Sequence, residues 1–151
     1  ILDYRQQLKT SNIFLMFKTV LFPVDLSREA REAADKVINI VKTFQSRLIL
    51  VSVVEVVSEG QKPFHPEMTS SETVNQLLQQ AKSIFTEEGI EAEILQKEGH
   101  PAFTICDLAD EIEADLIVIG CRGTGLTEEG ATDSVSNRII NLSPCPILVV
   151  P

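Results

Sequence analysis

The stretch that decides the fold is residues 114–125, ADLIVIGCRGTG, continued through residue 142 by LTEEGATDSVSNRIINL. Residues 114–119 form a short β-branched run that is typical of a strand buried on both faces. A glycine-rich segment follows it, and residues 134–142 have the pattern of a helix. Strand, glycine-rich loop and helix start make an anion site, because backbone N–H groups turn inward and the helix N-terminus carries partial positive charge. The sequence therefore indicates a phosphate cradle.

The rest of the chain alternates strands and helices. Apolar runs predict strands over residues 19–25, 47–54, 90–97 and 145–150, and helical periodicity follows the first three. The pattern β-α-β-α-β-α-β-α-β predicts a parallel sheet with helices on both faces. Ligands of such sheets bind at the carboxyl ends of the strands, where Asp25 and Gly120 are expected.

Local signals set the helix ends. Ser27 is expected to cap the first helix, Gly89 to end the second, and Pro101 to begin the third. Residues 55–71 carry two prolines and a glycine without a period, which predicts a long loop. The third helix is expected to face inward through its apolar side chains, which are Phe103, Ile105, Cys106, Leu108, Ala109 and Ile112.

Composition excludes several classes of protein. The formal net charge of −9 argues against sequence-independent binding to nucleic acid or to anionic membranes, which needs clustered Lys and Arg. No apolar run approaches the roughly 20 residues of a membrane span. The 3 cysteines are widely spaced and odd in number, which favours a reducing cytoplasm over a disulfide framework or a metal site.

The chain of 151 residues is expected to form one domain over residues 16–151. Residues 1–15 show no clear period and precede Met16, so we interpret them as an upstream extension or a cloning remnant outside that domain. They have neither the continuous apolar core nor the cleavage site of a signal peptide.

Three other phosphate-site motifs do not fit. A P-loop needs Lys after the second loop glycine, where this chain has Leu126. A dinucleotide fingerprint follows the first strand, whereas these glycines follow the fourth. A receiver domain needs paired acids after the first strand and a Lys near the last, and this pattern is absent from the sequence.

Five segments in order resemble the universal stress protein family. They are residues 24–27 (VDLS), 50–53 (LVSV), 99–101 (GHP), 114–120 (ADLIVIG) and 143–150 (SPCPILVV). The resemblance covers nearly the whole chain after Met16. It implies a Rossmann-like, doubly wound sheet of order 3-2-1-4-5, a homodimer through residues 145–150, and a role in the stress response.

The resemblance also implies a site for ATP or AMP with Mg²⁺. Some members of the family bind nucleotides and others do not. The positions that match its nucleotide-binding residues are Pro23, Val24, Asp25, Ser27, Val53, Ile119, Gly120, Arg122, Gly123, Asp133, Ser134 and Val135. Asp25 would lie near ribose or adenine, and Val53 would offer its backbone to adenine. Little or no catalytic turnover is expected, because no nucleophile and base arrangement is visible.

Residue 133 departs from the family pattern G-x2-G-x9-G-[ST]. Gly120, Gly123 and Ser134 match it, but Asp133 stands at the third glycine. A carboxylate within about 4 Å of a phosphate costs roughly 1 to 4 kcal/mol, depending on the dielectric. The departure leaves two functions open. One is a nucleotide-binding regulatory module, and the other is a nucleotide-free dimeric stress-response or scaffold protein that acts through protein partners.

Several of these residues also have plain structural interpretations. Asp133 is a candidate N-cap that would take the N–H groups of the last helix itself. Asp25 is an equal candidate for capping the first helix alongside Ser27, and Ser134 is a candidate first-turn residue of the last helix. His65 and His100 are interpreted as ordinary polar residues, since neither has a catalytic partner in the sequence.

Overall fold

A computed structural model describes residues 16–63, 65–121 and 134–151. The elements in chain order are β1 (Thr19–Pro23), α2 (Arg28–Phe44), β2 (Arg47–Glu55), the 3₁₀ turn η2 (Pro66–Thr69), α3 (Ser71–Glu87), β3 (Ala92–Gly99), α4 (Pro101–Glu111), β4 (Leu116–Gly120), α6 (Val135–Leu142) and β5 (Ile147–Val150).

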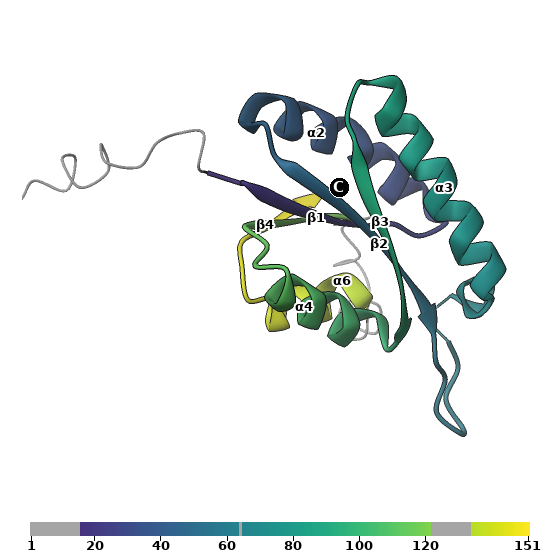
Figure 1. The fold of residues 1–151 in the computed structure, drawn as a ribbon. Coiled ribbons are helices and arrows are strands. Elements are labelled where there is room, and N and C mark those ends of the chain that lie inside the picture. Colours follow the sequence, from purple (N-terminus) through teal and green to yellow (C-terminus); the bar gives the residue numbers. More distant parts are fainter. Residues whose placement is uncertain (1–15, 64, 122–133) are drawn as a thin grey trace, which may run out of the picture.

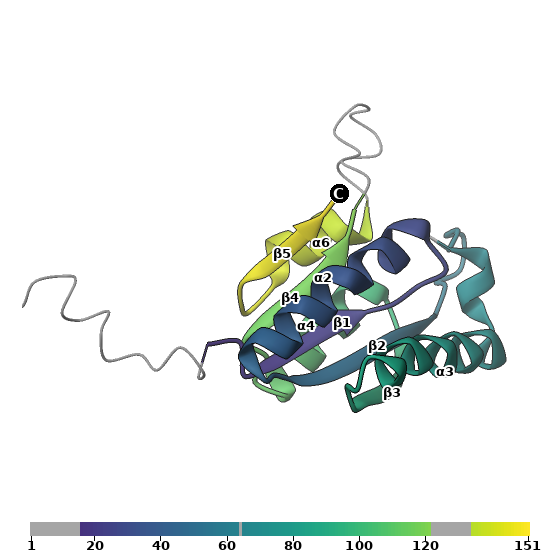
Figure 2. The same cartoon turned by 90° about the horizontal axis from the view of Figure 1, so that it is seen from above.

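The five strands form one parallel sheet of order β3-β2-β1-β4-β5, which confirms the predicted topology. Helices α2 and α3 cover one face of the sheet and α4 and α6 the other (Figure 1). Viewed from above, β3 and β5 lie at opposite edges (Figure 2). The strand order reverses between β1 and β4, so their carboxyl ends leave room for a ligand.

Each face of the sheet has its own core, because side chains alternate along every strand. Under α2 and α3 the core includes Phe22 and Phe85, which pack edge to face with their ring centroids 6.1 Å apart. Under α4 and α6 it includes Leu21, Ile117 and Ile139, which are at most 1% exposed. The two cores hold the carboxyl ends of the central strands in a rigid frame.

Most helix ends follow the predicted signals. The Ser27 side chain caps α2 by accepting the N–H of Ala30 at 3.2 Å. Pro101 is the first residue of α4, and Gly89 adopts a φ of +76° just after α3. Pro23 is the last residue of β1, where its missing N–H does not interrupt the ladder.

Three predictions need correction. Residues 55–71 are not a continuous loop, because Glu55 completes β2 and η2 forms around the buried Met68. The third strand runs from Ala92 to Gly99, since it pairs with β2 along its whole length. Phe103 is 51% exposed, because it lies on the side of α4 that faces away from the sheet core.

Cys106, Cys121 and Cys145 are free thiols. None of the helices within the described residues has both the length and the apolar character that crossing a bilayer requires.

Candidate functional site

A cavity of about 480 Å³ lies at the carboxyl ends of β1, β2 and β4, next to the first turns of α2 and α6. The residues that line it along the strand ends are Pro23, Val24, Asp25, Val51, Val53, Glu55, Ile119, Gly120 and Cys121. Its volume falls in the range of small-molecule sites, which is about 300–1,000 Å³. The crevice predicted between Asp25 and Gly120 is therefore present.

Two hydrogen bonds fix the backbone that carries Asp25. The N–H of Val24 donates to the carbonyl of Val51 at 2.8 Å, and the hydroxyl of Ser52 donates to the carbonyl of Val24 at 2.9 Å. Ser52 is buried, so water does not compete for this bond. The end of β1 is thus tied to β2 before the chain turns into α2.

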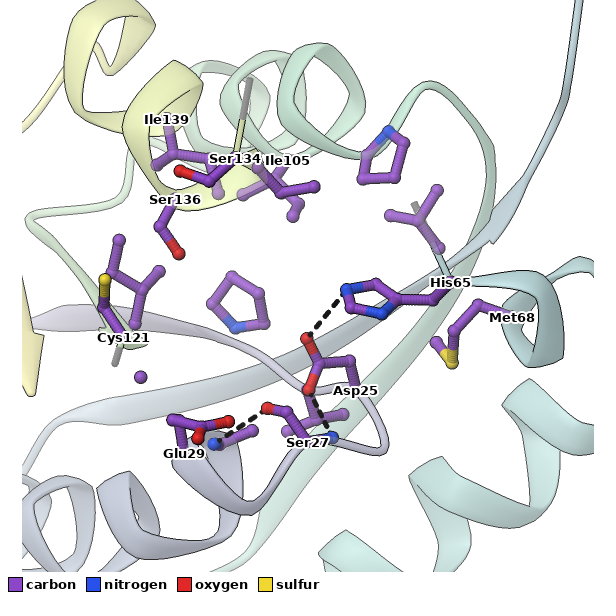
Figure 3. A pocket seen from close by; sticks show the side chains of 18 of the residues that line it. Asp25, Ser27, Glu29, His65, Met68, Ile105, Cys121, Ser134, Ser136 and Ile139 are labelled. Carbon is purple, nitrogen blue, oxygen red and sulfur yellow. Dashed lines mark hydrogen bonds and ion pairs between the residues drawn. The ribbon is translucent and has the colours of Figure 1, made fainter. Parts of the chain in front are cut away.

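Asp25 closes that turn and also reaches the cavity. Its Oδ1 accepts the N–H of Ser27 at 2.8 Å, and Ser27 in turn is the N-cap of α2. Its Oδ2 lies 4.0 Å from Nε2 of His65, which is beside it at the end of the cavity away from α6 (Figure 3). Ser27 therefore accepts an N–H of α2, Asp25 Oδ1 accepts the N–H of the cap residue itself, and Oδ2 is the Asp25 oxygen nearer His65.

The first turn of α6 supplies hydrogen-bond donors at the opposite wall. Ser134 is the N-cap, and its Oγ accepts the N–H of Asn137 at 3.1 Å. Helix geometry leaves the N–H groups of Val135 and Ser136 without an intrahelical acceptor. Ser134, Val135 and Ser136 all line the cavity, and Figure 3 shows the side chains of the two serines at this wall. This arrangement favours an anion.

The interpretation of Asp133 as the N-cap is wrong, because Ser134 holds that position. For the same reason Ser134 is not a first-turn residue but the residue before it. Asp133 itself lies outside the described residues, as do Arg122 and Gly123, so their predicted contacts with a ligand stay predictions.

Gly120 has a packing role that the sequence did not reveal. A Cβ built on it would lie 2.8 Å from the amide nitrogen of Ala30 and closer still to the carbonyl of Glu29. Both groups belong to the backbone of the first turn of α2, so no side-chain movement can relieve the overlap. Gly120 is therefore required for α2 to approach β4, whether or not a ligand is bound.

The end of the cavity away from α6 combines apolar and acidic groups. Met68 and His65 lie at this end and Cys121 at the other (Figure 3). Glu55, at the end of β2, is only 6% exposed, and its Oε1 accepts the backbone N–H of His65 at 3.2 Å. This bond and the buried Met68 hold η2 against the sheet.

Sequence reasoning missed Glu55, His65 and Ser136 as cavity residues. Glu55 carried a usable signal, because it is an acid at the end of an apolar run in the sequence, as Asp25 is. Ser136 follows the N-cap by two positions, where a side chain can lie beside the helix N-terminus. His65 carried no local signal, since only the position of η2 brings it to Asp25.

The comparison with known families agrees with this geometry. The model of the universal stress protein family matches residues 16–151, which are the predicted domain. The chain belongs to the universal stress protein family.

Relatives within the family match over most of their length. A universal stress protein of Synechocystis sp. is 55% identical over 143 residues, covering 95% of this chain and 91% of the relative. One of Methanocaldococcus jannaschii is 33% identical over 141 residues, covering 89% and 82%.

Solved structures of the family share the fold. A universal stress protein in complex with cAMP aligns with a TM-score of 0.72 at 22% identity, over 90% of this chain and 98% of that chain. A family protein of Arabidopsis thaliana with AMP bound aligns with a TM-score of 0.68 at 20% identity, over 88% and 90%. At these identities the likeness shows the fold alone.

Proposed function

We propose that the cavity binds an adenine nucleotide, ATP or AMP, and that the protein acts as a regulatory module with little or no turnover. The observation that carries this proposal is that hydrogen-bond donors and a carboxylate lie on opposite walls of one cavity. The first turn of α6 offers N–H donors, and Asp25 offers a carboxylate oxygen. Relatives of the same fold hold cAMP and AMP.

The chemistry of the two walls fits the parts of a nucleotide. The N–H groups of Val135 and Ser136 would donate to phosphate oxygens, and the Ser136 hydroxyl lies on the same turn. The Oδ2 of Asp25 would accept hydrogen bonds from ribose hydroxyls. Val51 and Val53 provide an apolar floor for the flat base. With ATP, Mg²⁺ would offset part of the phosphate charge.

A nucleotide-free role is the second candidate, because the site is acidic. Asp25, Glu29 and Glu55 line the cavity, and the chain carries a net charge of −9. In that case the protein would act as a homodimeric scaffold through β5. Leu148 and Val149 on β5 are partly exposed, which is what an edge strand available for pairing with a second chain would show.

Isothermal titration with ATP, ADP, AMP and cyclic AMP, each with and without Mg²⁺, separates the two candidates. The regulatory module requires saturable binding of at least one of them. If none of the four nucleotides gives a heat of binding or raises the melting temperature, the nucleotide-free scaffold is supported instead.

Asp133 gives the titration a sharper form. Asp133→Gly is expected to strengthen ATP binding by about 1 to 3 kcal/mol, roughly 5- to 150-fold, because it would remove a negative charge near the phosphates. Asp133→Asn is the matched control, since it removes the charge and keeps the side chain. Because Ser134 is the N-cap, neither variant should change the melting temperature of the free protein much. Equal ATP affinity in all three proteins would show that residue 133 does not face the phosphates.

A further inference from the structure

The cavity has two chemically different ends. Ser134, Ser136 and Cys121 gather around the first turn of α6 and the end of β4, which suits phosphate. His65 and Met68 lie at the other end (Figure 3). Asp25 stands between the walls, with its Oδ2 4.0 Å from His65. A nucleotide with its phosphates at α6 would therefore present its base to the end formed by β2 and η2.

A buried carboxylate faces that end. Val51, Val53 and Glu55 alternate along β2, so their side chains share one face, and all three line the cavity. The neighbouring residue on β3 is Gly99, which has no side chain to cover the carboxylate. Glu55 is thus the polar residue that continues the cavity-lining face of β2 beyond Val53.

The Glu55 carboxylate keeps unused acceptor capacity. In the described part of the chain it receives one backbone N–H, that of His65, shared between Oε1 at 3.2 Å and Oε2 at 3.4 Å. A carboxylate has about four lone-pair positions. None of the ion pairs within the described residues includes Glu55, although it is only 6% exposed. Buried charges are normally paired or fully hydrogen-bonded, so a further donor is expected.

We infer that Glu55 accepts a hydrogen bond from the amino group of the base and so makes the site select nucleotides whose base edge carries a donor. This inference rests on the proposed nucleotide binding. A carboxylate is acceptor-only, so a base without a donor at that edge leaves Glu55 buried with a single shared N–H. Glu55 would then determine specificity in addition to holding η2.

The test compares AMP with purine riboside 5′-monophosphate, which carries hydrogen in place of the 6-amino group. Guanosine monophosphate is a poor probe, because its N1–H and 2-amino groups are also donors. The wild type should bind AMP about 10- to 100-fold more tightly than the purine riboside nucleotide, the effect expected for a hydrogen bond to a charged group.

Three variants separate specificity from support of η2. Glu55→Gln keeps an acceptor without the charge, so the preference for AMP should shrink several-fold. Glu55→Met keeps the length and removes both acceptors, so the preference should fall to about onefold. Glu59→Met is the matched control, because Glu59 is exposed on the same connection and should leave the preference unchanged.

Each other result has a distinct meaning. A wild type that binds both nucleotides equally well would overturn the inference and leave the proposed function standing. So would Glu55 variants that lose affinity for both nucleotides by the same factor, since that result indicates support of η2 alone. If the wild type binds neither of these monophosphates, the inference fails. The proposed function fails with it only when the titrations with ATP, ADP and cyclic AMP also show no binding.

Discussion

Replacing Gly120 by alanine tests the packing of α2 against β4. The added Cβ would lie 2.8 Å from the amide nitrogen of Ala30 and even closer to the carbonyl of Glu29, distances that real Cβ atoms essentially never show. The overlap involves backbone, so the whole first turn of α2 must move. Overpacking of this kind costs about 1–3 kcal/mol. For a domain of this size that corresponds to a melting temperature lower by about 2–12 °C.

Gly60→Ala is the matched control for this change. Gly60 has a φ of +82°, and a Cβ on it would have no neighbour within 4 Å. Its replacement should lower the free energy of unfolding by about 1–2 kcal/mol, because alanine is strained in the left-handed conformation, and should cause no steric overlap. Because Gly60 does not line the cavity and the first turn of α2 does, only Gly120→Ala should also weaken nucleotide binding.

Differential scanning fluorimetry and titration with AMP measure the two effects. A Gly120→Ala protein that melts within 1 °C of the wild type would refute the reasoning. It would mean that α2 and β4 are further apart than described, and that the glycine serves the ligand instead.

Two further predictions concern assembly and the thiols. Val149 is 38% exposed on the edge strand β5, and we expect it to lie in a homodimer interface. Val149→Lys should therefore give a monomer in light scattering at tens of micromolar. A dimer in this variant would contradict that interface. Burial raises the pKa of the Cys106 and Cys145 thiols, so their alkylation at about pH 8 should be slower than that of an ordinary thiol. Since the folded state holds these protons more tightly, their contribution to stability is present at neutral pH and is lost as the pH rises through the folded pKa. Alkylation of both residues at the ordinary rate would contradict the burial.

The sequence by itself determined the fold and the place of the cavity. Alternating apolar runs and helical periods leave a parallel sheet as the arrangement that buries both faces, and its ligands bind at the carboxyl ends of the strands. Asp25 follows the end of β1 by two residues and Gly120 ends β4, and both line one cavity. Ser27 and Pro101 mark helix starts because capping depends on neighbours within a few residues.

Only the tertiary structure decided which interactions those residues make. Gly120 fits a phosphate loop in sequence, yet its described contact is with the backbone of α2, about 90 positions earlier in the chain. From the sequence, Glu55 is predicted to begin a loop. In the structure it is the last residue of β2, accepts the backbone N–H of His65 and lines the cavity with Val51 and Val53. Periodicity reports which face of an element is apolar, whereas close approach and partner choice depend on how two distant elements pack, and no local pattern records that.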